Sequence, residues 1–205
     1  MTFAQLNEQD TQVLLKLCGA LFYYHPNQYQ SAGLSSIFSN EQNLTLMPVA
    51  TMLSEFRTAD LEALALEYDR LFCGVEEMIA PPWGSAYLDK EAVLFGDSTV
   101  AYRHFLDRCG FELNSEQKEP EDHLGLMLMV LSMLVAHQQP QQAKELLEQH
   151  MLTWSGYFLN RFHTATQSPA FLALADVTEL LLQELCVRFE AKPLTKKDYW
   201  HVTQS

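Results

Sequence analysis

Apolar residues recur along most of the chain at the three- and four-residue spacing of amphipathic helices. The first predicted helix ends before Pro26, because proline disfavours helical geometry at the residue before it. A second helix is predicted to begin after Asp60, a favourable N-cap, and to end at Gly74. The two faces consist of Leu14, Leu17, Cys18 and Leu21 in the first helix, and Leu61, Leu64, Ala65, Tyr68 and Phe72 in the second.

Three further helices and two helical regions follow from the same pattern. One helix is predicted from Asp97 to Gly110, and another begins at Glu119-Pro120, where proline suits the first turn. Residues 140–162 carry a helical face that fits either one long helix or two helices joined near His150. Ser168-Pro169 opens the last helix, and residues 33–57 are also expected to be helical.

The chain shows neither an internal repeat nor a linker, so we predict a single domain over residues 1–205, with a loose C-terminal tail from about Pro193. Residues 74–96 form the one long segment without a clear helical period. A loop of this length in a compact domain is usually functional or disordered. Its aromatic residues Trp83 and Tyr87 argue against disorder.

Composition narrows the classes of protein that fit. The chain has 13 Lys and Arg against 26 Asp and Glu, a net charge of −13. This field excludes nucleic acid and anionic lipid as partners and favours a basic partner. Hydrophobic residues make up 48% of the chain, which is ample for a core, and 8 glycines are few for a turn-rich β fold or a nucleotide-binding α/β fold.

Compartment and membrane topology follow from the cysteines and the apolar runs. Cys18, Cys73, Cys109 and Cys186 lie far apart in the sequence, so we expect reduced, mostly buried thiols. The longest apolar run, residues 124–136, is shorter than the roughly 20 residues of a membrane-spanning helix. The N-terminal residues show no targeting pattern, so the protein is expected to remain in the cytoplasm.

The strongest candidate for chemistry is the cluster Glu119, Glu121, Asp122 and His123. Its acids would lie at the positive end of a helix dipole, although two or three acids behind a proline are also an ordinary helix start. A metal site would need more ligands, and nothing in the spacing places another histidine beside His123. The sequence also lacks the common nucleotide-binding, hydrolase and zinc-protease motifs.

A second candidate is the loop around Pro82 and Trp83. Adjacent prolines stiffen this segment, so Trp83 either packs into the core or forms a rigid aromatic wall for a ligand peptide. Tyr68, Leu71 and Phe72 lie on or beside the buried face of their helix and are either core residues or the lining of a pocket.

Together these segments resemble the TorD/DmsD family of redox-enzyme maturation chaperones. The resemblance rests on YDRLFCG at residues 68–74, PPWGS at 81–85 and EPEDH at 119–123, in that order. GALFYY at 19–24 and LFGDST at 94–99 make it most similar to the branch that matures dimethyl sulfoxide reductase. That branch has tryptophan where this chain has Tyr68, so a client related to trimethylamine N-oxide reductase stays an alternative.

The resemblance implies an all-α, single-domain helical bundle that is not an enzyme and uses neither cofactor nor metal. It implies binding of the twin-arginine leader of a molybdoenzyme precursor, which delays export until the cofactor is inserted. Further implied partners are Tat translocase subunits and molybdenum-cofactor biosynthesis proteins, and the expected state is a monomer. The leader-binding residues carried over from the family are Tyr68, Leu71, Phe72, Pro82, Trp83, Asp122 and His123.

A physical rationale accompanies this resemblance. A leader joins a basic segment to an apolar stretch, so Asp122 with Glu119 or Glu121 would accept the arginine donors. We expect Trp83 to be an exposed loop indole and Asp122 a first-turn carboxylate, both contributing little to the core. His123 would orient Asp122 or bond the leader backbone.

Two other classes of function stay open at this stage. One is a metal-dependent hydrolase that uses Asp122 and His123, and the other is a structural adaptor without a peptide groove. Guanine nucleotide is not expected, because the chain lacks a glycine loop that would cradle phosphate.

Overall fold

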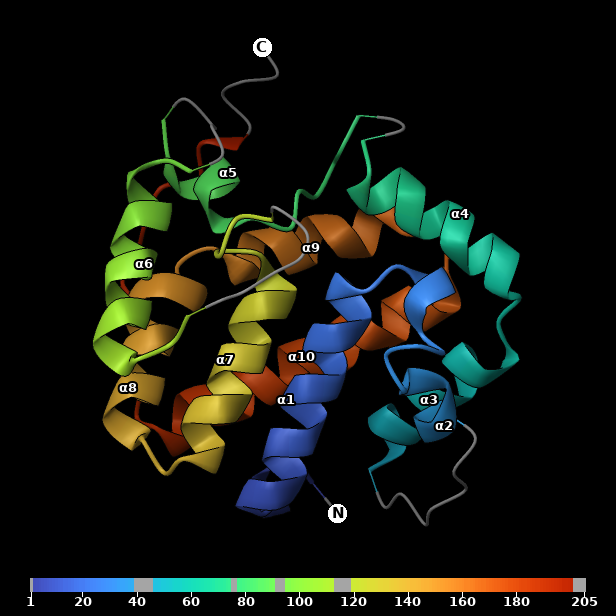
Figure 1. Cartoon of the computed structure of the whole chain (residues 1–205), viewed down its shortest axis with the longest axis horizontal. Helices are drawn as coiled ribbons and strands as arrows, with labels where there is room; N and C mark the ends of the chain where they lie inside the picture. Colours follow the sequence, from blue (N-terminus) through green and yellow to red (C-terminus); the bar gives the residue numbers. More distant parts are fainter. Residues whose placement is uncertain (1, 39–45, 75–76, 91–94, 113–118, 201–205) are drawn as a thin grey trace.

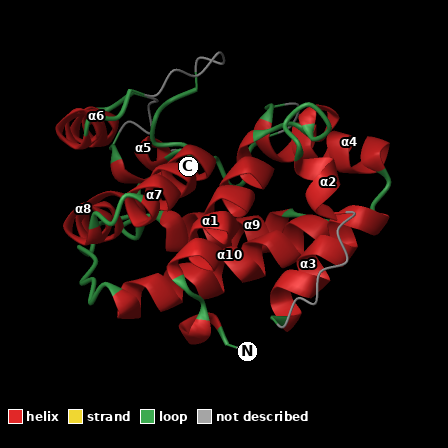
Figure 2. Cartoon of the chain, turned by 60° about the horizontal axis from the view of Figure 1, so that its bottom comes forward, coloured by secondary structure: helices red, strands yellow, loops and turns green. Residues whose placement is uncertain are grey.

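The computed structural model describes residues 2–38, 46–74, 77–90, 95–112 and 119–200, and every regular element within them is helical (Figures 1 and 2). The expected all-α fold is confirmed. The short elements are the 3₁₀ turns η1 (Phe3–Gln5) and η2 (Pro26–Gln28) and the π-helical turn η3 (Leu146–Met151). The α-helices are α1 (Glu8–Tyr23), α2 (Leu34–Phe38), α3 (Met47–Thr58), α4 (Leu61–Phe72), α5 (Gly84–Leu88), α6 (Asp97–Cys109), α7 (Leu124–Ala136), α8 (Pro140–Glu145), α9 (Ser155–Ala165) and α10 (Pro169–Arg188).

Local signals set several of the predicted helix ends. The Asp60 carboxylate accepts a hydrogen bond from the backbone N–H of Ala63 and so caps α4. Ser168 is the N-cap of α10, with Pro169 in the first turn. At the end of α6, Gly110 adopts a φ of 74°, a left-handed conformation that glycine takes without steric cost. These predicted ends are confirmed.

The predicted start of α7 is wrong. The helix begins at Leu124 with His123 as its N-cap, so residues 119–122 precede it. A tertiary contact explains the delay, because the Leu124 N–H donates to the carbonyl of Pro82 at 2.8 Å and the Asp122 side chain bonds outside the helix. Asp122 is therefore no first-turn residue.

Other segments also differ in part from expectation. Residues 140–162 form α8 and η3 and then, after a break at Trp154, α9, so this region contains two helical stretches. The segment expected to be a loop over residues 74–96 contains the short helix α5, while residues 75–76 and 91–94 lie outside the described part. Residues 33–57 supply α2 and most of α3, and residues 39–45 likewise lie outside it.

The centre of the molecule is the contact between α1 and α7, the most extensive between any two helices of the described chain (Figure 1). Gly19 and Gly125 meet there, and a Cβ built on Gly19 would lie 2.6 Å from the carbonyl oxygen of Gly125. Because any side chain would collide with backbone, glycine at both positions permits the close approach. Helix α10 packs on α1, α3 and α9, and the buried side chains form one hydrophobic cluster.

The expectation of a loose tail is wrong for residues 193–200, although residues 201–205 lie outside the described part. The Leu194 N–H donates to the carbonyl of Glu148 at 2.9 Å, and the Tyr199 N–H donates to the carbonyl of Tyr87 at 2.9 Å. Residues 194–199 therefore form a segment held against α5 and η3.

The cysteines also depart from expectation. All four are free, but Cys18 alone is buried, while Cys73 is exposed and Cys109 and Cys186 are intermediate. The expectation of mostly buried thiols is wrong. Among the helices of the described residues, none combines the length and apolar character needed to cross a bilayer.

Candidate functional site

Two sequence motifs that are distant in the chain meet through their backbones. Trp83 and His123 form an isolated antiparallel β-bridge. On either side of it, the Gly84 N–H donates to the Asp122 carbonyl at 3.1 Å and the Leu124 N–H donates to the Pro82 carbonyl at 2.8 Å. We call this contact the Trp83–His123 bridge. It positions the end of the proline-rich loop against the start of α7.

The side chain of Asp122 faces inward and is 3% exposed. Its Oδ2 accepts from the Ser85 N–H at 2.6 Å and from the Thr99 hydroxyl at 3.2 Å. Burial raises the pKa of this carboxyl, because a charge is poorly solvated there. The expectation that Asp122 contributes little to the core is wrong.

Trp83 is 9% exposed, so the expectation of an exposed loop indole is also wrong. Its Nε1–H donates to the Glu119 carboxylate at 2.9 Å. The His123 ring packs edge-on against Trp83 and against Tyr23. Glu119 remains half-buried, as does Glu121, whose carboxylate forms an ion pair with Arg103 at 2.8 Å.

His123 has a structural role that its sequence position did not reveal. Its Nδ1 accepts from the Gly125 N–H at 3.0 Å, which caps α7. Burial lowers the pKa of this imidazole to about 3, so the ring is neutral at physiological pH. The hydrogen bonds of the Asp122 carboxylate come from Ser85 and Thr99. The structure therefore gives no support to the hypothesis that His123 orients this carboxylate.

The α4 residues of the predicted site are buried. Tyr68 donates from its hydroxyl to the carbonyl of Tyr23 at 2.8 Å. The Phe72 ring stacks on Phe162 with centroids 5.6 Å apart, and Leu71 is 4% exposed. Tyr68 reaches the bridge only indirectly, through Tyr23. Leu71 and Phe72 support the site from the core.

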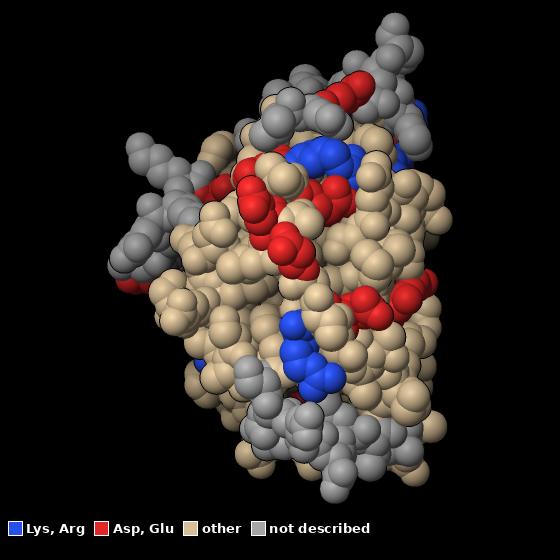
Figure 3. Space-filling model, turned by 90° about the vertical axis from the view of Figure 1, so that its right-hand side faces the viewer, with Lys and Arg blue, Asp and Glu red and all other residues tan. Residues whose placement is uncertain are grey.

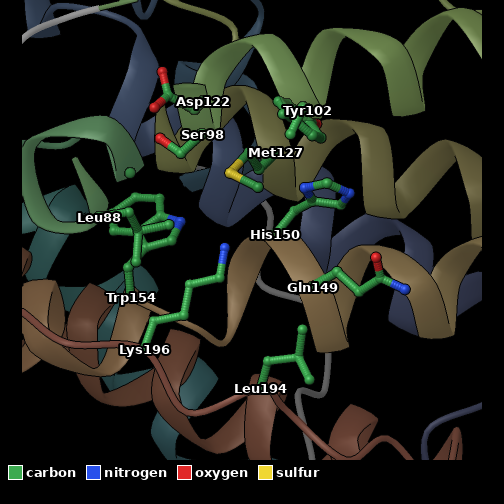
Figure 4. Close-up of a pocket in the computed structure, with 12 residues that line it drawn as sticks. Leu88, Ser98, Tyr102, Asp122, Met127, Gln149, His150, Trp154, Leu194 and Lys196 are labelled. Carbon is green, nitrogen blue, oxygen red and sulfur yellow. The ribbon is translucent and has the colours of Figure 1, made fainter. Parts of the chain in front are cut away.

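A cavity of about 130 Å³ lies on the inner side of Asp122 (Figure 4). Three buried polar atoms on its lining residues have no hydrogen-bond partner among the described residues: Asp122 Oδ1, the Tyr102 hydroxyl and Trp154 Nε1. Tyr102 and Trp154 are each 1% exposed. Buried polar groups are normally bonded, so this lining suits a polar or charged guest.

Sequence reasoning missed several residues of this region. Ser85 and Thr99 hold the Asp122 carboxylate, and Trp154 and His150 line the cavity from the far side. The available signal was a small hydroxyl residue in the predicted loop, Ser85, and another in the first turn of a predicted helix, Thr99, because such groups often form local hydrogen bonds. Nothing in the sequence placed α9 beside the loop.

The described residues offer little support for a metal centre. Their His, Cys, Asp and Glu side chains form no group of three that could hold an ion. The Nδ1 of His123 is already committed to Gly125. Acidic side chains gather on the face that carries α4, with Lys and Arg side chains beside and below them (Figure 3).

Comparison with known proteins gives consistent matches. A family model described as nitrate reductase delta subunit matches residues 38–160. "Tat proofreading chaperone DmsD" of Salmonella typhimurium strain LT2 is 35% identical over 201 residues, covering 92% of this chain and 97% of that protein. "Probable Tat proofreading chaperone DmsD" of Haemophilus influenzae is 34% identical, covering 86% and 90%.

The fold is also similar to that of a solved structure. The "Crystal Structure Of A Putative Redox Enzyme Maturation Protein From Archaeoglobus Fulgidus" superposes with a TM-score of 0.57 at 20% identity, covering 82% of this chain and 93% of that one. The sequence matches extend over nearly the whole chain. On this evidence the chain belongs to the TorD/DmsD family of redox-enzyme maturation chaperones.

Proposed function

We propose that this protein is a cytoplasmic, system-specific chaperone that binds the twin-arginine leader of a molybdoenzyme precursor and delays its export until the cofactor is inserted. The observation that supports this proposal is the Trp83–His123 bridge, which brings together the two motifs that we predict to bind the leader. The relatives named as Tat proofreading chaperones support the same function. Dimethyl sulfoxide reductase is the proposed client, with a trimethylamine N-oxide reductase-like enzyme as the alternative.

The chemistry of the site fits a leader that is basic and partly apolar. Glu119 offers a partly exposed carboxylate beside an aromatic side chain. Arginine bonds carboxylates through paired donors, so the partly exposed Glu119 carboxylate suits a guanidinium. The net charge of −13 speeds the encounter with a basic peptide.

The buried members of the predicted site act by shaping it. Leu71 and Phe72 fix the end of α4, and Tyr68 ties α4 to the end of α1 through the Tyr23 carbonyl. Pro82 and His123 hold the bridge. We propose that these side chains position the surface that the leader contacts, and that the protein acts without catalysis.

Binding of a synthetic peptide tests this function. The probe carries two consecutive arginines followed by an apolar stretch of about 12 residues, the usual length of a leader core. We expect micromolar or tighter binding, weaker when both arginines are alanine and weaker at high salt, because charge pairing is screened. Calorimetry that shows no binding of either peptide contradicts the proposal.

A matched pair of variants locates the binding. Glu119→Gln removes the partly exposed carboxylate of the site, while Glu62→Gln removes one from the exposed first turn of α4. We expect Glu119→Gln to weaken binding by about 1 kcal/mol, as for a lost charged hydrogen bond, and Glu62→Gln to leave it unchanged. Equal effects would mean that only the overall charge attracts the leader.

A further inference from the structure

The C-terminal segment, residues 194–200, has the chemical order of an export leader. Lys196-Lys197 is the one place in the sequence where two basic residues are adjacent. Asp198 follows, and after it come the large aromatic residues Tyr199 and Trp200. A leader likewise joins a basic segment to an apolar one. Residues 194–200 therefore share with the proposed ligand a basic pair that precedes large apolar side chains.

This segment is docked in an extended conformation. Backbone hydrogen bonds join Leu194 to Glu148 and Tyr199 to Tyr87. The carbonyl of Lys196 accepts from the Tyr157 hydroxyl at 2.9 Å. These contacts hold the backbone much as a bound peptide would be held, because main-chain hydrogen bonds supply affinity for extended peptides.

The segment also touches the loop that precedes Trp83. The indole of Trp200 donates from Nε1 to the carbonyl of Ile79 at 3.2 Å. Asp198 pairs with Arg161 of α9, whose guanidinium lies 5.2 Å from the centroid of the Tyr87 ring. The C-terminal segment thus bonds to the chain on both sides of the proline-rich motif.

Lys196 connects the segment to the predicted binding residues. It lines the same cavity as Asp122, and its amino group points between Trp154 and His150 toward the cavity centre (Figure 4). Opposite it lies the Asp122 Oδ1 that no described residue bonds. The Lys196 ammonium at the mouth of the cavity and the Asp122 carboxyl inside it carry complementary charge when both are ionised, so they attract each other.

We propose that residues 194–200 are an intramolecular competitor of the leader, in which Lys196 covers the cavity of Asp122 until a leader displaces the segment. This inference rests on the proposed function. Leu194 is 53% exposed and Lys196 is also exposed, so the apolar contacts that oppose release of the segment come mainly from Trp200, which packs against the Tyr87 ring. Weakly packed terminal segments open at low free energy without unfolding the core.

The proposal predicts the size of the effect. If leader binds only the open form, the apparent dissociation constant is the intrinsic one divided by the open fraction. A segment docked in about nine molecules of ten therefore weakens binding roughly tenfold. Removing the segment should recover that factor.

The experiment compares the full chain with a chain that ends after Pro193, using a fluorescent form of the peptide with two arginines and an apolar stretch. We expect the shortened chain to bind about tenfold more tightly. Lys196→Ala should strengthen binding by a smaller factor. Lys192→Ala is the matched control, because it removes the same charge from an exposed lysine that does not line the cavity.

The outcomes separate this inference from the proposed function. If the full chain binds the peptide and the shortened chain binds with equal affinity, the segment does not compete and the inference fails alone. If neither chain binds, the proposed function fails and the inference with it. If Lys196→Ala and Lys192→Ala change the affinity for the peptide equally, Lys196 has no specific role in covering the cavity.

Hydrogen exchange on the full chain covers the case in which the shortened chain does not fold. The amides of Leu194 and Tyr199 are hydrogen-bonded in the docked state and should lose protection when the peptide binds. Unchanged protection at a saturating concentration of peptide overturns the proposal.

Discussion

Replacing Trp83 by alanine tests whether the candidate site is part of the core. The indole is 9% exposed and donates to Glu119. A tryptophan buries about 150–250 Å², which at about 25 cal/mol per Å² corresponds to roughly 4–6 kcal/mol as an upper estimate. Measured truncations of buried aromatic residues cost about 3–5 kcal/mol. We therefore expect Trp83→Ala to lower the free energy of unfolding by about 3–5 kcal/mol.

The smaller change Trp83→Phe separates packing from hydrogen bonding. It keeps an aromatic ring and removes the Nε1–H that bonds Glu119. Since Glu119 is half-buried, water can replace the lost donor, and we expect a cost of about 1–2 kcal/mol including imperfect packing. Urea unfolding followed by helical circular dichroism measures both changes.

Leader binding measured on the folded fraction completes the test. Trp200→Ala is the control for stability alone, since it removes a less buried indole and should cost at most about 1 kcal/mol, whereas its segment is proposed to compete with the leader. A loss below about 1 kcal/mol for Trp83→Ala, together with lost binding, would refute the reasoning. The indole would then be an exposed anchor, as the sequence alone suggested.

Three further predictions concern the core around the same site. Gly19→Ala places a Cβ 2.6 Å from the Gly125 carbonyl oxygen, so we expect at least about 1–3 kcal/mol of destabilisation in thermal unfolding, and an unchanged melting temperature would contradict the close contact. Burial lowers the pKa of His123 to about 3 in the folded chain, whereas the imidazole of the unfolded chain takes up its proton near pH 6.5. As the pH decreases below about 6.5, this group therefore lowers the free energy of unfolding by up to about 1.4 kcal/mol per pH unit. His123→Gln should reduce that slope in urea titrations between pH 6.5 and 4, and an identical slope would show that the ring is not buried neutral. Asp122→Asn keeps an acceptor for the Ser85 N–H and should stay within about 1 kcal/mol of the parent at neutral pH, whereas Asp122→Ala should cost about 1–3 kcal/mol. Equal losses in chemical denaturation would show that the charge itself is required.

Helix existence and most helix ends could be predicted from the sequence because they depend on local chemistry. Asp60 and Ser168 cap the helices that follow them, and Gly110 ends α6 with a backbone conformation that suits glycine. The start of α7 could not be predicted in this way. Its residues are drawn into contacts with Pro82 and Ser85, far away in sequence, and these tertiary bonds override a local signal that Pro120 alone supports.

The candidate site was only partly accessible to sequence reasoning. The motif order placed Trp83 and Asp122 in one site, and the bridge brings them together. Their burial was missed, because a loop indole and an acid after proline carry no periodic pattern that reports exposure. The docking of residues 194–200 was missed for a related reason, since its contacts to Tyr87 and Tyr157 are made by backbone groups that any sequence possesses.

The Trp83–His123 bridge has a consequence for how this chain tolerates change in length. Backbone contacts join residues 82–84 to residues 122–124, so the intervening chain, which includes α6, is a closed loop with both ends fixed. Doubling the length of a closed loop costs only about 0.6 kcal/mol in chain entropy. Insertions or deletions between α6 and Glu119 should therefore leave the bridge in place, so the length of the chain there can change while residues 82–84 and 122–124 keep their contact.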